Sequence, residues 1–60
     1  MGEKIRQARE NAGLTQKQLA EALGLDQSAV SNWETGKSEP VINNLRRLAD
    51  ILGCNPADLL

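Results

Sequence analysis

The sequence predicts an all-α fold, a compact domain of five short helices, and three observations lead to this expectation. Thr15, with Gln18 three residues later, forms the pattern of a capping box, which marks the start of a helix. Gly24 and Gly36 stand where a glycine in the left-handed conformation commonly ends a helix. Apolar residues recur at spacings of three and four, as in amphipathic helices. The 60 residues are enough for one domain, so residues 1–60 are expected to fold as a single unit.

Each predicted helix has a start signal, a stop signal or an apolar stripe. The five helices are expected at about residues 2–12, 16–23, 27–35 and 42–52, with a short last helix from Pro56. The side chains that should face the core are Ile5, Ala8 and Ala12; Leu19 and Leu23; Ala29, Val30 and Trp33; and Ile42, Leu45, Leu48, Ala49 and Leu52. Asp26 repeats the capping pattern before the third helix, whereas Val41 gives the fourth helix no capping side chain. Cys54 is interpreted as a small buried hydrophobic residue.

The second and third predicted helices are separated only by residues 24–26. A link this short suits two helices that cross steeply, as in a helix-turn-helix, and does not suit two helices that lie side by side. A helix-turn-helix is therefore expected at about residues 16–35.

One side of the predicted helix 27–35 has an unusual composition. On a helical wheel at about 100° per residue, its outer arc holds the uncharged hydrogen-bonding side chains Gln27, Ser28, Ser31, Asn32 and Thr35. A helix face that is merely solvated usually carries Lys, Glu and Arg, which have higher helix propensities than Ser, Asn and Thr. Such an array of donors and acceptors is able to read base edges in the major groove of DNA. The alternative interpretation is a polar face that happens to lack charges.

The stretch from Leu14 to Lys37 resembles the helix-turn-helix of the phage-repressor/Cro-type DNA-binding domains. The matching motifs are G-L-T-Q at residues 13–16, L-A at 19–20, L-G-L at 23–25, Val30, and W-E-x-G-K at 33–37. Further motifs before and after this stretch extend the resemblance over nearly the whole chain. It implies a lambda-repressor-like fold and sequence-specific binding of double-stranded DNA, as a transcriptional repressor or the DNA-binding domain of one.

The helical wheel and the resemblance together assign roles to individual side chains. The expected readers of base edges are Gln27, Ser28, Ser31 and Asn32. The side chains expected to position the DNA backbone are Thr15, Gln16, Lys17, Lys37 and Asn44. Two simpler interpretations stay open, because Gln16 also fits a solvated helix start and Asn44 a weak first helical turn. Glu39 departs from the family, in which this loop often carries basic residues.

The resemblance also implies a structural ion pair. Arg9 borders the apolar stripe of the first helix, where an arginine commonly just extends to water. In the family an arginine at this place often pairs with the glutamate of W-E-x-G. Arg9 is therefore expected to bind Glu34 and to tie the first helix to the third.

Composition argues against several classes of function. The chain has no His and one Cys, which excludes an internal disulfide, makes a zinc site implausible and removes the usual general base of an enzyme. We therefore expect no catalytic residue, no metal, no cofactor and no small-molecule ligand. No apolar run reaches the length of a membrane span, so a cytoplasmic protein is expected.

The net charge of −1 is unfavourable for a protein that binds a polyanion. Basic and acidic residues four positions apart are expected to pair along their helices: Arg6 with Glu10, Lys17 with Glu21, and Arg46 with Asp50. This leaves Lys4, Lys37 and Arg47 without such partners and predicts weak non-specific binding to DNA. The alternative function is a protein-interaction or dimerisation module of the same fold that has lost DNA binding.

The expected partner is double-stranded DNA with an inverted-repeat site, because one recognition helix contacts few base pairs. Two copies of the chain would then bind together, as a homodimer that is weak in solution. Leu59 and Leu60 are expected either to seal the core or to contact the second copy.

Overall fold

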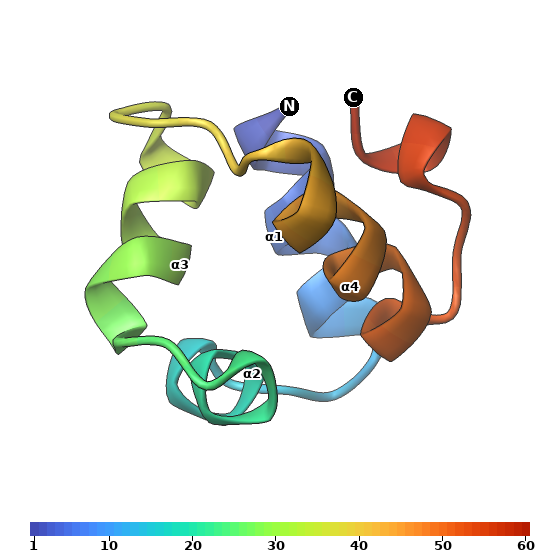
Figure 1. Cartoon of the computed structure of the whole chain (residues 1–60). Coiled ribbons are helices and arrows are strands. Elements are labelled where there is room, and N and C mark those ends of the chain that lie inside the picture. The colour runs from blue at the N-terminus through green and yellow to red at the C-terminus, as the bar shows by residue number, and fades with distance from the viewer.

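The computed structural model describes residues 1–60, and its regular structure is entirely helical (Figure 1). The elements are α1 (Gly2–Asn11), α2 (Gln16–Leu23), α3 (Gln27–Thr35), α4 (Ile42–Leu52) and the 3₁₀-helix η1 (Pro56–Leu59). The predicted all-α fold is confirmed, but the number of α-helices is four and not five. The last segment is a 3₁₀ turn because its hydrogen bonds span three residues, as from Asp58 N–H to the Asn55 carbonyl at 2.9 Å. None of the helices has both the length and the apolar composition that crossing a membrane requires.

The helices α2 and α3 cross steeply at one edge of the molecule. In Figure 1, α2 is seen nearly end-on at the bottom while α3 rises along the left side, and α4 lies in front of α1. α1 packs against α3 and against η1, and α4 packs against α2 and η1. The short link between α2 and α3 thus produces the helix-turn-helix that the sequence predicts.

The start and the end of α2 follow from its sequence. The Thr15 hydroxyl accepts a hydrogen bond from Gln18 N–H at 3.0 Å, and Gln18 Oε1 accepts one from Thr15 N–H at 2.9 Å, which completes the predicted capping box. Gly24 ends the helix with a φ of 72°. This left-handed conformation costs a residue with a Cβ about 1–2 kcal/mol, so glycine lets the chain turn toward α3 without strain.

The start of α3 differs from the expectation in one detail. Asp26 occupies the N-cap position, but its side chain makes no capping hydrogen bond, so this part of the prediction is wrong. The N–H of Ala29 instead donates to the backbone carbonyl of Asp26 at 3.0 Å. The backbone alone therefore closes the first turn of α3.

The apolar side chains of all five elements form one core. It contains Ile5 of α1, Leu19, Ala20 and Leu23 of α2, Val30 and Trp33 of α3, Leu45, Leu48 and Ala49 of α4, and Leu59 of η1. Leu59 is fully buried and closes the core, whereas Leu60 is 56% exposed. Cys54 packs half-buried against the core, and this burial raises the pKa of its thiol. A raised thiol pKa fits the expected packing role, because the thiolate is the reactive form.

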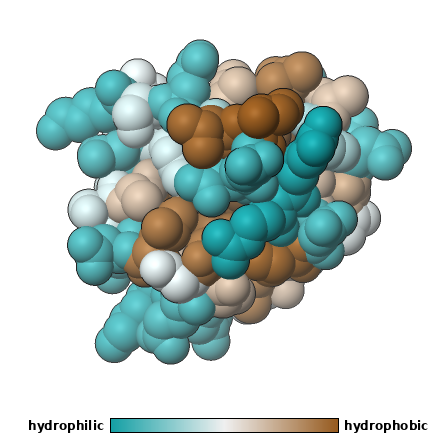
Figure 2. All heavy atoms as spheres, viewed as in Figure 1, coloured by the Kyte–Doolittle hydropathy of each residue, from teal (hydrophilic) through white to brown (hydrophobic).

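Two side chains predicted to face the core do not, and both lie at helix ends. Ala12 is exposed because α1 ends at Asn11, one residue earlier. Ile42 is 60% exposed because the packed face of α4 begins one turn later, at Leu45. The adjacent Val41 is 66% exposed, so the start of α4 carries a small apolar patch. On the face shown in Figure 2, apolar residues lie above and below a band of hydrophilic side chains that crosses its centre.

The charge pairs predicted within single helices do not form as expected. Arg6 pairs with Glu3 and not with Glu10. The acidic residue is then the N-terminal partner, which is the more favourable order on a helix. The other two predicted pairs, Lys17 with Glu21 and Arg46 with Asp50, are also absent.

Gly2 marks the closest approach between α1 and α3. A Cβ at Gly2 would lie 2.6 Å from the carbonyl oxygens of both Trp33 and Glu34, closer than such contacts occur in proteins. The first turn of α1 therefore abuts the last turn of α3, and the absence of a side chain at Gly2 makes this possible.

Gly2→Ala is expected to lower stability even though alanine has the higher helix propensity. The propensity gain is at most about 1 kcal/mol. Overpacking costs about 1–3 kcal/mol, because the backbone of α1 or α3 must move to admit the methyl group. Thermal unfolding followed by circular dichroism measures the effect, with Lys4→Ala, at an exposed position of the same helix, as the control. A midpoint at or above that of the wild type would contradict the close contact.

Candidate nucleic-acid interface

The outer side of α3 carries the uncharged side chains that the sequence assigns to base reading. Gln27 and Ser28 are exposed, and Ser31 and Asn32 are half-buried. On the opposite side of the helix Val30 is completely buried. The core thus fixes α3 from one side, and the donors and acceptors of the other side face solvent.

Thr35 belongs to the same outer arc, but its hydroxyl is used within the helix. Thr35 Oγ1 donates to the Ser31 carbonyl at 3.0 Å and lies 3.4 Å from the Asn32 carbonyl. Gly36 then ends α3 with a φ of 81°. Thr35 therefore stabilises the last turn of α3 and is less free than its neighbours to contact a ligand.

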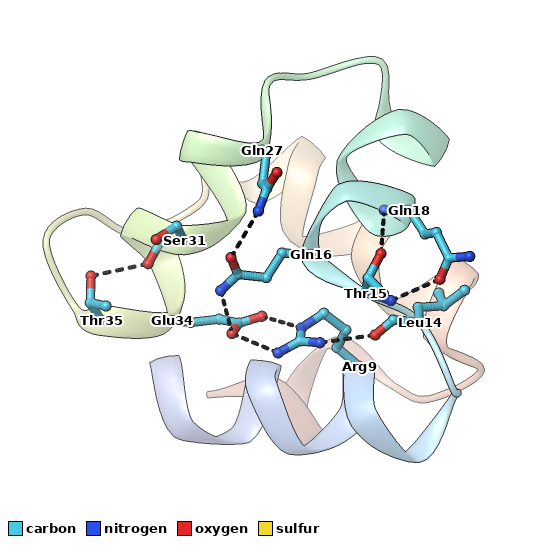
Figure 3. Close-up of polar contacts among 9 residues, drawn as sticks. All are labelled: Arg9, Leu14, Thr15, Gln16, Gln18, Gln27, Ser31, Glu34 and Thr35. Atoms are coloured by element: carbon cyan, nitrogen blue, oxygen red, sulfur yellow. Dashed lines mark hydrogen bonds and ion pairs between the residues drawn. The ribbon is translucent and has the colours of Figure 1, made fainter.

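Arg9 and Glu34 lie in contact between α1 and α3 (Figure 3). Arg9 Nε donates to Glu34 Oε2 at 2.6 Å, and Nη2 donates to Oε1 at 3.1 Å, in the side-by-side geometry of a strong ion pair. Arg9 Nη1 also donates to the Leu14 carbonyl at 2.9 Å. The hydrogen bond with Glu34 raises the pKa of Arg9 above its ordinary value. Arg9 thus joins three segments: α1, the turn before α2, and α3.

Glu34 has a second polar partner that the sequence did not reveal. Gln16 Nε2 donates to Glu34 Oε1 at 3.1 Å, and Gln27 Nε2 donates to Gln16 Oε1 at 3.4 Å, which is a long hydrogen bond. Figure 3 shows the resulting polar chain, which runs from Arg9 through Glu34 and Gln16 to Gln27. The sequence assigns Gln16 and Gln27 to different tasks, whereas the structure brings their side chains together at the starts of α2 and α3.

The side chains assigned to the DNA backbone lie in three places. Thr15, Gln16 and Lys17 form the start of α2, where free backbone N–H groups favour an anion. Lys37 is exposed in the loop that follows α3. Asn44 is half-buried on α4, and no hydrogen bond connects it to α2 or α3.

The sequence predicts that Arg47 has no partner, because no acidic residue lies four positions away, but the structure gives it one. Its Nη2 donates to the Leu23 carbonyl at 2.9 Å and so caps the last turn of α2. This contact ties α4 to the helix-turn-helix. The spacing of charges gave no sign of it, because the acceptor is a backbone oxygen on another helix.

The fold is that of a known class of proteins. The helix-turn-helix family matches residues 5–59, which is nearly the whole chain. The chain belongs to the phage-repressor/Cro-type helix-turn-helix family.

Individual members of the family are similar over the whole chain. The HTH-type transcriptional regulator DicA of Escherichia coli is 45% identical over 60 residues, which are 100% of this chain and 44% of that protein. The chain therefore spans less than half the length of this relative.

Two solved structures have the same fold. The P22 c2 repressor protein of Salmonella phage P22, crystallised with a synthetic operator, is 37% identical with a TM-score of 0.92, and the match covers 98% of this chain and 89% of that one. The restriction-modification controller protein C.AhdI of Aeromonas hydrophila is 36% identical with a TM-score of 0.89 and the same coverage, 98% and 89%. These similarities confirm the lambda-repressor-like fold class that the sequence predicts.

Proposed function

We propose that this chain binds double-stranded DNA in a sequence-specific manner, with α3 in the major groove, as the DNA-binding domain of a transcriptional repressor. The observation that carries the proposal is the outer side of α3, which presents uncharged donors and acceptors while its inner side is fixed in the core. A helix held in this way has the dimensions to enter the major groove. The activity is binding alone, without a chemical step. Its proposed location is the cytoplasm, in keeping with the bacterial and phage regulators among the relatives.

Gln27 and Asn32 are the proposed readers of adenine. A side-chain amide can donate to adenine N7 and accept from N6–H at the same time, which no other base pair allows in the same geometry. Ser28 and Ser31 can donate or accept, so they contribute contacts that several base pairs satisfy. Specificity is therefore expected to depend mainly on the two amides.

Thr15, Gln16, Lys17 and Lys37 are the proposed contacts to the DNA backbone, with Asn44 as a neutral donor. Few cations are free to join them, because Arg9 is held by Glu34 and the net charge is −1. The salt dependence of binding should therefore be shallow, with a slope of about −2 to −4 per monomer if two to four phosphates are neutralised. The same acidic balance favours the alternative of a protein-interaction module, which would not be retained on DNA even at low salt.

Selection of bound sequences from a random pool of duplex DNA is expected to yield an inverted repeat. α3 contacts few base pairs, so useful specificity needs two copies on a two-fold site, with centres about 34 Å apart along the DNA. The protein should be a monomer or a weak dimer in solution and should bind the two half-sites cooperatively. Titration of the full site and of a single half-site measures this cooperativity.

The selection has two informative negative results. Enriched sequences with a single half-site and no repeat would contradict paired binding. A pool without any enriched sequence would contradict DNA reading itself and would favour the protein-interaction alternative.

A further inference from the structure

The hydrogen bonds that link Arg9, Glu34, Gln16 and Gln27 form a polar chain in which all donors point toward the same residue. Glu34 accepts hydrogen bonds through both of its oxygens, from Arg9 and from Gln16. Gln16 in turn accepts one from Gln27. Every donor in the chain therefore points toward Glu34 (Figure 3), and Glu34 is the only member that has no hydrogen to donate.

An ionised carboxylate fixes the orientation of an amide that lies beside it. Glu34 binds the charged guanidinium of Arg9, its side chain is 3% exposed, and it can only accept hydrogen bonds. Gln16 must then turn its NH₂ group toward Glu34, because its oxygen would face another acceptor there. The Gln16 oxygen faces Gln27, which must in turn direct its own NH₂ group to that oxygen. The orientation of both amides thus follows from the carboxylate.

We propose that Glu34 is a specificity-determining residue, because it sets which atoms of the Gln27 amide face the DNA. This inference rests on the proposed function, since Gln27 reads a base only if α3 enters the major groove. With one N–H of Gln27 bound to Gln16, the other N–H and Oε1 remain for the base. One donor and one acceptor match adenine N7 and N6–H, whereas two donors would match the two acceptors of guanine. Glu34 therefore favours adenine at this base pair from a buried position.

The substitution E34Q removes the constraint at nearly unchanged size. The new amide can offer either its oxygen or its NH₂ group to Gln16, so both orientations of Gln27 become available. We expect the preference for adenine over guanine at the base pair read by Gln27 to fall by about fivefold or more, the lower limit for loss of a bidentate contact. Binding to random-sequence DNA should change little, because E34Q removes none of the side chains proposed to contact the DNA backbone. An unchanged adenine preference in E34Q would overturn the proposal.

R9K is the matched control for the loss of the ion pair. It also weakens the contact between α1 and α3, but it leaves the Glu34 carboxylate facing Gln16. Both variants are measured at a temperature at which circular dichroism shows them folded. R9K should keep the wild-type base preference while E34Q loses it. An equal loss of base preference in both variants would show that Glu34 acts only by stabilising the fold, and it would overturn the proposal.

Q16A tests the same series of hydrogen bonds by removing a side chain that is not part of the core. The loss of a backbone contact should lower the general affinity of Q16A for DNA. In addition, Q16A should relax the preference at the Gln27 base pair by the same factor as E34Q. The double variant E34Q/Q16A should show no further relaxation. A wild-type ranking of bases in Q16A would contradict the proposal even if E34Q did not fold.

The free protein gives a readout that does not depend on DNA. In nuclear magnetic resonance spectra the Nε2 protons of Gln16 should be shifted relative to those of Gln18, whose Oε1 and not its Nε2 is bonded. The shift should change in E34Q, where the NH₂ group of Gln16 can donate to Gln27 as well as to residue 34, and it should stay at its wild-type value in R9K. Shifted Gln16 signals together with no base preference would refute the proposed function alone. Gln16 signals that match those of Gln18 in the wild type would refute the amide constraint.

Discussion

Glu34→Ala and Arg9→Ala are each expected to lower the thermal midpoint sharply. The pair bridges α1 and α3 with side chains that are only 3% and 12% exposed, so removing one partner leaves the other charge in a poorly hydrated place. Breaking a buried pair in this way costs about 3–5 kcal/mol. A domain of this size has a total stability of roughly 3–9 kcal/mol, so either substitution removes a large part of it.

A double-mutant cycle separates the pairing from other effects of each side chain. The double variant should lose much less than the sum of the two single losses, because neither charge is left alone. Arg6→Ala is the control, since Arg6 pairs with Glu3 on the exposed surface of α1 and its loss should barely change the midpoint. Strictly additive losses for Arg9 and Glu34 would contradict a coupled pair.

Gln27→Ala and Asn32→Ala are expected to weaken binding to the preferred DNA site by about 1–3 kcal/mol each. Both side chains are uncharged and lie on the outer side of α3, so they add little to the attraction for phosphates. Binding to unrelated DNA should therefore be nearly unchanged, and each variant should relax the preference at one base pair. Asn11→Ala, which removes an exposed side chain at the end of α1, is the control and should leave both affinities unchanged.

Lys37→Ala is expected to weaken binding to DNA in general and to leave the sequence preference unchanged. Lys37 is exposed just beyond α3, where its charge can meet a phosphate but its side chain cannot easily reach a base edge. Affinity for the preferred site and for unrelated DNA should fall alike, and the salt slope should decrease by about one unit. A selective loss at the preferred site would place Lys37 among the readers instead.

Most of the fold was predictable because its signals are local. The capping box of Thr15 and Gln18 involves residues three positions apart, and the left-handed glycines Gly24 and Gly36 depend only on their own backbone conformation. Each of these features is present as the sequence predicts. The partner of Arg9 was different, because spacing alone left it open and only the resemblance to the family pointed to Glu34.

The features that sequence analysis missed depend on where helices meet. Ile42 has the spacing of a core residue, but α4 is buried against the other helices only from Leu45 onward. The close contact at Gly2 and the capping of α2 by Arg47 each need two helix ends that are distant in sequence to be adjacent in space. The contact between Gln16 and Gln27 was hidden for the same reason, since only the crossing of α2 and α3 brings them together.

The claim that α3 reads the DNA sequence is tested most directly by one titration. Wild type, Gln27→Ala and Asn32→Ala are titrated with the preferred duplex and with a scrambled duplex of the same composition, at two salt concentrations. We expect the ratio of the two affinities to fall by about fivefold or more in each variant, while the salt slope stays at its wild-type value. A ratio that both variants leave unchanged would contradict the assignment of α3 as the reading helix.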